Sequence, residues 1–445
     1  MTAIDRIEKL VEDKGIEFFL CSFVEMGGMP KAKLVPAKFL RDMAEGSAGF
    51  AGFAAGNMGQ GPHDTDMAAI PDFDSLTPIP WRQNVAWVAS NIQVEEAPWP
   101  YCPRTILERQ LESARGKGYV LKTGVEPEFF LLRRDETGGY QPYDPLDTLG
   151  KPCYDLSALN RSLDLMTTLL TYLDELGWEP YANDHEDANC QFEINWTYST
   201  ALRTADRHTF YRWMVKACAE ERGLAATFMP KPFAHLTGNG AHFHTSLWDP
   251  DSDANLFLDE SDENGLSKEA YHFIGGLKKH ARALAAVTSP IVNSYKRLIR
   301  GAPRSGATWA PVFVTYGGSN RTQMLRIPGP GRVEIRTVDG AVNPYLAATA
   351  ILAAGLDGIE NELPAGERND RNLYEVPMEE IKAAGIDLLP TNLSEAVDAL
   401  EQDQVLMDAL GFSYGEYYVQ VKRDEWKAYH DSVSQWEVDT YLGQY

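Results

Sequence analysis

Two glutamates, Glu126 and Glu128, stand two residues apart in the apolar stretch Lys122-Thr-Gly-Val-Glu-Pro-Glu-Phe-Phe-Leu-Leu132. In a β-strand, residues i and i+2 point to the same face, so both carboxylates would project together. Two like charges side by side in a buried element are costly unless a cation neutralises them. Such hard oxygen ligands suit Mg²⁺ or Mn²⁺. The alternative is a sheet edge with both glutamates in water, but the flanking apolar residues favour a metal site.

Other predicted strands carry polar residues in a similar way. They are Glu193 in residues 190–196, His242 and His244 in residues 241–248, and Glu334 and Arg336 in residues 332–336. Buried polar groups at this density need metal, substrate or one another as partners. We therefore expect several strands to line a concave, charged sheet.

Arginine is concentrated in one part of an otherwise acidic chain. Seven arginines fall within 40 residues: Arg297, Arg300, Arg304, Arg321, Arg326, Arg332 and Arg336. Guanidinium groups bind carboxylates and phosphates, whereas surface salt bridging is the alternative for any single arginine. The chain has neither a GxxxxGK[ST] motif nor a GxGxxG motif that follows a strand and opens a helix. A bound nucleotide would therefore be held by metals, arginines and sheet side chains.

Length and composition narrow the class of protein. A chain of 445 residues is too long for one typical core, so we expect two domains. The net charge of −23 argues against a nucleic-acid or anionic-membrane partner. Five scattered cysteines with no CxxC pair, and no apolar signal core or membrane span, predict a reduced, cytoplasmic protein.

The pattern of apolar residues and breakers predicts an α+β chain with a boundary in the proline-rich residues 97–103. Domains would then span residues 1–100 and 101–445. The expected elements are a β-hairpin over residues 17–35, a mobile loop at 46–61, helices over 157–176, 205–222, 268–288 and 343–359, and an acidic, solvated loop at 249–264.

A set of motifs resembles the glutamine synthetase family, in family order across nearly the whole chain. They are Val125-Glu-Pro-Glu-Phe-Phe, His185-Glu186 with Gln191-Phe-Glu193, Met229-Pro-Lys-Pro, Gly238-Asn-Gly-Ala-His-Phe-His244, Asn293-Ser-Tyr-Lys-Arg-Leu298, Asn320-Arg321 with Arg326-Ile-Pro, and Asn343-Pro-Tyr-Leu-Ala-Ala. The resemblance implies a small N-terminal β-grasp domain and a large catalytic domain with a curved antiparallel sheet flanked by helices. It also implies a homo-oligomer of two stacked hexameric rings, with active sites between neighbouring subunits.

The resemblance assigns a role to each motif residue. One Mg²⁺ or Mn²⁺ would lie on Glu128, Glu186 and Glu193, and a second on Glu126, His242 and Glu334. Arg297 and Arg336 match positions that face substrate carboxylate and phosphate, Arg321 and Arg326 match the arginines of the γ-phosphate, His244, Ser246 and Arg332 match nucleotide contacts, and Gly238 matches a backbone contact to glutamate. Thr237 stands where the family usually has asparagine. The implied reaction activates glutamate with ATP as γ-glutamyl phosphate, which an amine then converts to an amide.

The chain departs from the family pattern at two places that concern the choice of amine. Ammonia-using members carry an aspartate in an N-terminal loop and a glutamate before Ala-Pro-Val, whereas this chain has Phe53-Ala-Ala-Gly-Asn-Met58 and Trp309 there. A tryptophan face offers an apolar wall and a cation–π contact to an alkylammonium, although Trp309 could instead only pack its own loop. We therefore expect a small alkylamine, with methylamine as the best single guess. Asp64, Asp66 or Glu186 could act as the base that deprotonates it.

Four alternatives stay open from the sequence. The chain could be an ammonia-using glutamine synthetase, a γ-glutamyl polyamine synthetase, a metal-dependent phosphohydrolase or an inactive structural relative, although the complete set of metal ligands argues against the last. Tyr374 matches a segment that is adenylylated in some bacterial members, but we expect it to be a packing residue.

Overall fold

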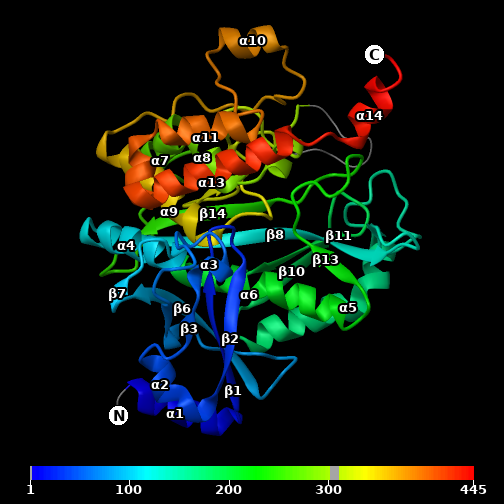
Figure 1. Cartoon of the computed structure of the whole chain (residues 1–445). Helices are drawn as coiled ribbons and strands as arrows, with labels where there is room; N and C mark the ends of the chain where they lie inside the picture. The colour runs from blue at the N-terminus through cyan, green and yellow to red at the C-terminus, as the bar shows by residue number, and fades with distance from the viewer. Residues whose placement is uncertain (1–2, 301–309) are drawn as a thin grey trace.

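The computed structural model describes residues 3–300 and 310–445 of the chain. Its strands form two sheets, one of seven strands near the N-terminus and one of ten strands in the remainder (Figure 1). Helices cover both faces of the larger sheet, with α5 and α6 on one side and α7, α8, α9, α11 and α13 on the other. The predicted α+β class is confirmed. No described helix is long and apolar enough to cross a membrane.

The N-terminal sheet has the order β2-β1-β6-β4-β3, with β5 and β7 also paired to β6. Its strands are β1 (Phe18–Val24), β2 (Pro30–Pro36), β3 (Gly49–Phe50), β4 (Met67–Pro71), β5 (Thr77–Pro78), β6 (Val85–Val94) and β7 (Ala97–Pro98). The helices of this part are α1 (Ala3–Lys14), η1 (Ala37–Phe39), α2 (Leu40–Ala44), α3 (Gly52–Ala55) and η2 (Phe73–Ser75). The predicted hairpin is confirmed by the antiparallel pairing of β1 with β2, and β1 also runs parallel to β6. The expected loop at 46–61 contains β3 and α3, so it is not wholly irregular.

The second sheet has the order β10-β11-β8-β14-β17-β16-β15, with β9, β12 and β13 paired to β8. Its strands are β8 (Val120–Arg134), β9 (Tyr140–Pro142), β10 (Pro180–His185), β11 (Gln191–Trp196), β12 (Ser199–Thr200), β13 (Ala225–Thr227), β14 (Ala241–Trp248), β15 (Tyr316–Gly317), β16 (Leu325–Arg326) and β17 (Val333–Ile335). All described pairs are antiparallel except β15 with β16. The long strand β8 is the centre of the sheet because five other strands pair with it.

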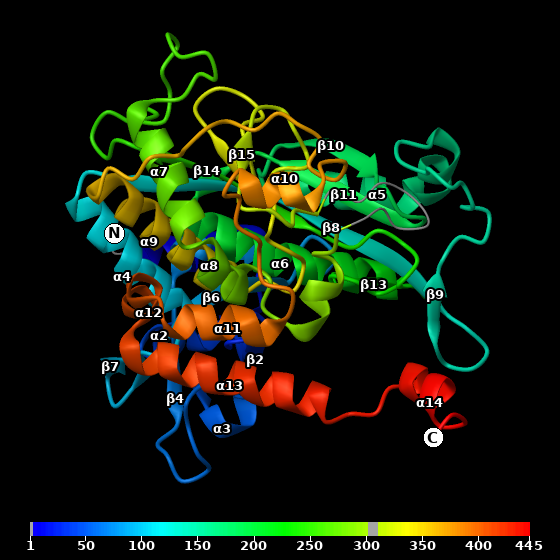
Figure 2. The same ribbon diagram turned by 90° about the horizontal axis from the view of Figure 1, so that it is seen from above.

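Helices enclose this sheet. They are α4 (Pro103–Gly116), α5 (Leu156–Glu175), α6 (Ala201–Glu220), α7 (Lys268–Lys279), α8 (Ala281–Thr288), η3 (Val292–Lys296), α9 (Pro344–Glu360), α10 (Met378–Ala383), α11 (Leu393–Glu401), α12 (Gln404–Leu410), α13 (Phe412–His430) and α14 (Gln435–Tyr441). Helix α9 is buried along most of its length and begins at Asn343, whose side chain accepts from the backbone N–H of Tyr345 at 3.1 Å. Figure 2 shows α14 well separated from the end of α13.

One expectation about this part was wrong. The single helix predicted over residues 268–288 is divided at His280 into α7 and α8. His280 leaves helical geometry and its ring contacts two carboxylates, Asp403 at 2.6 Å and Asp357 at 3.0 Å. The prediction of an acidic, solvated loop at 249–264 is confirmed, since the segment is irregular and largely exposed, although Phe257 within it is fully buried and packs on Phe273 of α7.

A buried arginine joins the two sheets. Arg104 of α4 contacts Asp206 of α6 at 3.0 Å, and it also reaches Asp72 and Asn91 of the N-terminal part at 2.5 and 3.1 Å. A buried guanidinium needs such partners, because an unpaired charge in a core is strongly destabilising. The cluster therefore fixes the N-terminal sheet against helices α4 and α6. The domain boundary at residue 100 stays a prediction.

Candidate active site

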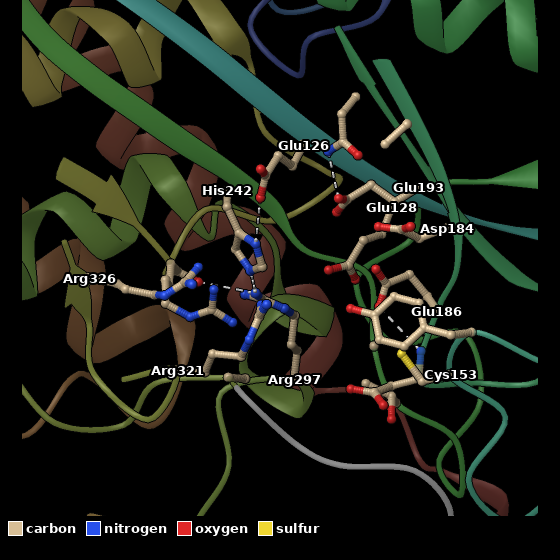
Figure 3. Close-up of a pocket in the computed structure, with 18 of the residues that line it drawn as sticks. Glu126, Glu128, Cys153, Asp184, Glu186, Glu193, His242, Arg297, Arg321 and Arg326 are labelled. Atoms are coloured by element: carbon tan, nitrogen blue, oxygen red, sulfur yellow. Dashed lines mark hydrogen bonds and ion pairs between the residues drawn. The ribbon is translucent and has the colours of Figure 1, made fainter. Parts of the chain in front are cut away.

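A cavity of about 690 Å³ opens over one face of the larger sheet (Figure 3). Its lining combines six carboxylates (Glu126, Glu128, Asp184, Glu186, Asp187 and Glu193) with five guanidinium groups (Arg297, Arg321, Arg326, Arg332 and Arg336). Figure 3 shows Glu128, Asp184, Glu186 and Glu193 on one side, and Arg297, Arg321 and Arg326 on the other. The cavity thus places an acidic wall opposite a basic wall.

Strand register explains the acidic wall. Glu193 of β11 lies between Glu128 of β8 and Asp184 of β10, each directly opposite it in an antiparallel pair. Residues directly opposite each other share one face of a sheet, so the three carboxylates form a row. Glu128 is held by the amide of Gln191 at 3.1 Å and by the backbone N–H of Gly240 at 2.7 Å.

The carboxylates of the acidic wall have raised pKa values. Burial, reinforced by neighbouring carboxylates, raises the pKa of Glu186 and of Glu193 well above the ordinary glutamate value. Burial likewise raises the pKa of Glu128, against the pull of Arg297. A divalent cation among these oxygens would favour the charged carboxylates. The donor set therefore fits a hard metal ion.

Glu126 lies at the boundary between the two walls and contacts two histidines. Its carboxylate is 3.7 Å from Nδ1 of His242 and 3.0 Å from Nε2 of His244, both on the neighbouring strand β14. Burial alone would raise the pKa of Glu126, but the two imidazoles hold it well below the usual range. Burial and Arg336 lower the pKa of His242 to about 4, so the neutral ring is available as a ligand.

Within residues 3–300 and 310–445, three groups of side chains bring possible metal-ligand atoms within 4.8 Å of one another. They are Glu126 with His244 and Glu334, Glu126 with Glu193 and His242, and Asp184 with Glu186 and Glu193. The predicted set of Glu128, Glu186 and Glu193 contributes two members to one group, and the set of Glu126, His242 and Glu334 contributes two members to each of the other groups. Asp184 stands with Glu186 and Glu193 where Glu128 was predicted, although Glu128 also lines the cavity. The assignment of individual ligands stays a prediction.

The basic wall is built partly on a fully buried carboxylate. Glu334 binds Arg326 at 2.8 Å and also binds Arg336. Burial would raise its pKa, but the charges of Arg336, His242 and His244 outweigh burial and lower the pKa to about 2. Arg297 donates to the carbonyl oxygens of Thr337 and Arg336 at 3.2 and 3.1 Å. Backbone and carboxylate partners thus fix these guanidinium groups before any anion arrives.

A second cavity of about 430 Å³ adjoins the first and shares Glu126, Tyr181 and Arg332 with it. The predicted nucleotide contacts His244, Ser246 and Arg332 line it. One wall is aromatic, since Trp248 donates from Nε1 to Ser246 at 2.8 Å and Lys122 lies 3.7 Å from the centre of its ring. A polar and aromatic slot beside an anion-binding cavity suits a nucleoside whose phosphates enter the larger space.

Gly238 lines the main cavity at a place that only glycine can occupy. A Cβ atom there would lie 2.3 Å from the carbonyl oxygen of Pro230, so the backbone approaches the cavity directly.

Of the three candidate bases, Glu186 lines this cavity, whereas Asp64 lies in the N-terminal part and accepts from the backbone N–H of Gly61. Asp66 does not line it either. Trp309 lies outside the described residues.

Sequence reasoning missed several residues that line the cavity. They are Lys151, Cys153, Tyr154, Tyr181, Asp184, Asp187, Asn195 and Lys231. Asn195 donates to Glu193 at 2.8 Å, and its place two residues after Glu193 could have revealed it. Lys231 stands inside one of the quoted motifs. Tyr154 lies on an irregular loop with a φ of 62°, for which the sequence gives no periodic signal.

Comparisons with known proteins agree with this geometry. The sequence model described as glutamine synthetase, catalytic domain, matches residues 100–441. A glutamine synthetase of Rhizobium meliloti is 47% identical, with 98% of this chain and 99% of the relative covered. A glutamate–methylamine ligase of Methyloversatilis universalis is 45% identical, with 98% of each covered. A solved complex of GmaS with ADP is 50% identical, with a TM-score of 0.92 over 98% of this chain and 99% of that one.

The chain therefore belongs to the glutamine synthetase family, as its motifs predicted. This family uses ATP and divalent metals. Within it, the protein is a glutamate–amine ligase.

Proposed function

We propose that the enzyme makes γ-glutamylmethylamide from glutamate, methylamine and ATP. The observation that carries the proposal is Trp309, which stands in the segment where ammonia-using members carry a glutamate. Residues 53–58, where those members carry the other acid, contain no carboxylate. The similarity to a glutamate–methylamine ligase and to GmaS supports this choice of amine.

The side chains divide the work in the proposed mechanism. His244, Ser246 and Arg332 hold the nucleotide in the smaller cavity, so that its phosphates point toward Glu126 and the basic wall. Arg297 and Arg336, together with the backbone at Gly238, orient glutamate. Arg321 and Arg326 stabilise the charge that develops on the γ-phosphoryl group as the glutamate carboxylate attacks it.

Two or more Mg²⁺ or Mn²⁺ ions would be held by Glu126, Glu128, Glu186, Glu193, His242 and Glu334, with Asp184 beside them. When bound, such ions neutralise phosphate oxygens and orient the transferred group. If Glu334 bound a metal ion, it would give up part of its contact with Arg326. The Arg326 guanidinium would then be able to bind phosphate.

The amine step needs a base, because an alkylammonium titrates near about 10.4, like lysine. Of the three candidates, Glu186 is the carboxylate that already lines the cavity, which supports it as the base. We further propose that the enzyme works in the cytoplasm as two stacked hexameric rings. Asp64 and Asp66 could then reach an active site only from a neighbouring subunit.

Ammonia is the second candidate for the amine. The glutamine synthetase of Rhizobium meliloti is as similar to this chain as the glutamate–methylamine ligase is. Initial rates with methylamine, ethylamine, a polyamine and ammonium at equal concentration separate the candidates. We expect the highest kcat/KM with methylamine, and a preference for ammonium would contradict the proposal.

A further inference from the structure

Gln191, the first residue of β11, is completely buried beside the acidic wall. Its amide oxygen accepts from the backbone N–H of Ala188 at 3.1 Å, which fixes the orientation of the amide. The amide nitrogen therefore points the other way, where it meets three acceptors. They are the Oε2 atom of Glu128 at 3.1 Å, the carbonyl oxygen of Gly238 at 3.0 Å and the side-chain oxygen of Asn239 at 2.9 Å.

The three acceptors compete for the hydrogens of Gln191. A side-chain amide nitrogen carries two hydrogens, so it can make two good hydrogen bonds at a time. A carboxylate is the strongest acceptor of the three because a charged partner shortens and strengthens a hydrogen bond. The strength of Glu128 as an acceptor therefore decides how firmly Gln191 holds residues 238 and 239.

Residues 238–240 are packed closely on their other sides. Asn239 donates from Nδ2 to the carbonyl oxygen of Met229 at 2.9 Å. A Cβ atom at Gly240 would lie 2.9 Å from Nη2 of Arg297, so the backbone there runs directly against the basic wall. A small change in how Gln191 holds this segment is therefore felt in the cavity, which Gly238 lines.

We propose that Gln191 is a positioning residue that couples cation binding on the acidic wall to glutamate binding at Gly238. When Glu128 binds a cation, it becomes a weaker acceptor, and both hydrogens of Gln191 turn to Gly238 and Asn239. The backbone at Gly238 is then held more firmly, which favours glutamate. Coupling between two ligands is reciprocal, so glutamate favours the cation by the same factor. The inference rests on the proposed function in one respect, that glutamate contacts the backbone at Gly238.

Two other effects have to be separated from this coupling. A cation and the carboxylates of glutamate attract each other directly, but that attraction is present with or without Gln191. A purely structural role of Gln191 would lower the stability of the protein and leave the coupling as it is. The informative quantity is therefore a coupling factor, the Kd of glutamate without Mg²⁺ divided by its Kd at saturating Mg²⁺, compared between the wild type and variants.

The test measures glutamate binding to the intact enzyme by isothermal titration calorimetry, with no nucleotide or amine present. Gln191→Met keeps the length of the side chain and removes both hydrogens. Its coupling factor should be about 5-fold smaller than that of the wild type, at the lower end of typical couplings between two sites. The Kd of ADP at saturating Mg²⁺ should stay unchanged, because His244 and Ser246 stand on β14 and not on β11.

Gln323→Met is the matched control. Gln323 is also completely buried, but its amide donates to the hydroxyl of Thr322 at 3.2 Å and to the carbonyl oxygen of Arg371 at 3.4 Å. The control therefore loses a buried amide of the same size without touching Glu128 or Gly238. It should keep the coupling factor of the wild type, even where both variants unfold at a lower temperature.

A coupling factor in Gln191→Met equal to that of the wild type would overturn the inference, and so would an equal fall in Gln323→Met. If Gln191→Met does not fold, Gln191→Asn decides by the same criterion, because its shorter side chain cannot reach all three acceptors. The titrations contain no amine. A preference of the wild type for ammonium would therefore refute the proposed function and leave this inference standing.

Discussion

The acidic wall and the edge of the same cavity at Ala310 are built in different ways. Glu128, Asp184 and Glu193 stand on three paired strands, so the hydrogen-bonded ladder sets their spacing. Ala310 and Tyr374 lie outside the helices and strands and are joined by a side-chain hydrogen bond. In the proposed function, activation of glutamate depends on the sheet, whereas the choice of amine depends on loops. A loop can change without disturbing the sheet, so under this proposal one fold could serve different amines.

The largest effect should come from the acidic wall. Glu193→Gln removes one charge from the centre of the carboxylate row and weakens metal binding, so kcat should fall by about 10³-fold or more. Steady-state rates over a Mg²⁺ titration give the measurement, and a chelator should abolish wild-type activity. Glu175→Gln on the exposed side of α5 is the control. Near-normal activity of Glu193→Gln would contradict the role of the acidic wall in metal binding.

A smaller effect should come from the amine side. Trp309→Glu replaces an aromatic face by a carboxylate, which favours the small hydrated ammonium ion over an alkylammonium. The ratio of kcat/KM for methylamine to that for ammonium should fall by roughly 10-fold, within the range of a desolvated cation–π contact. The KM for ATP should not change. An unchanged ratio would remove Trp309 from the account of specificity.

A substitution in the smaller, nucleotide cavity should change ATP binding and leave the preference among amines unchanged. Ser246→Ala removes the acceptor for Trp248 Nε1 and a predicted nucleotide contact. The KM for ATP should rise by about 3-fold, as for the loss of one modest hydrogen bond, and the preference among amines should stay the same. A changed amine preference would show that the nucleotide and amine sides are coupled.

The smallest effect concerns stability and lies outside the site. Burial lowers the pKa of His280, but the hydrogen bonds and charges of Asp403 and Asp357 outweigh it and raise the pKa above the ordinary value of 6.5. The stabilisation is then fully present below about pH 6.5 and is lost as the pH rises through the higher folded-state pKa. Urea unfolding at several pH values should show this loss. His280→Gln should remove that component, whereas His272→Gln on the same helix should keep it.

Much of the acidic wall could be predicted because strands alternate their side chains. The pair Glu126 and Glu128 was placed on one face from its spacing alone, and both residues line the cavity. Asp184 was missed because its position depends on the register between β10 and β11, which is a long-range property. The break at His280 was missed for a similar reason, since its two carboxylate partners lie 77 and 123 residues away.

For the proposed amine site, the sequence showed only where this chain differs from the family pattern. The sequence singled out Trp309 and Tyr374, but it gave no sign that Tyr374 contacts Ala310 or that Arg300 contacts Val376 of the same loop. Such contacts come from how irregular segments fold against one another, and hydrophobic periodicity carries no information about them. The roles of the individual site residues remain predictions until variants are measured.

The central claim is tested most directly by competition between amines in one vessel. Enzyme, glutamate, ATP and Mg²⁺ are mixed with equal concentrations of methylamine and ¹⁵N-ammonium, and both amide products are quantified by mass spectrometry early in the reaction. The account predicts that γ-glutamylmethylamide is the main product. A product pool that consists mainly of ¹⁵N-glutamine would contradict it.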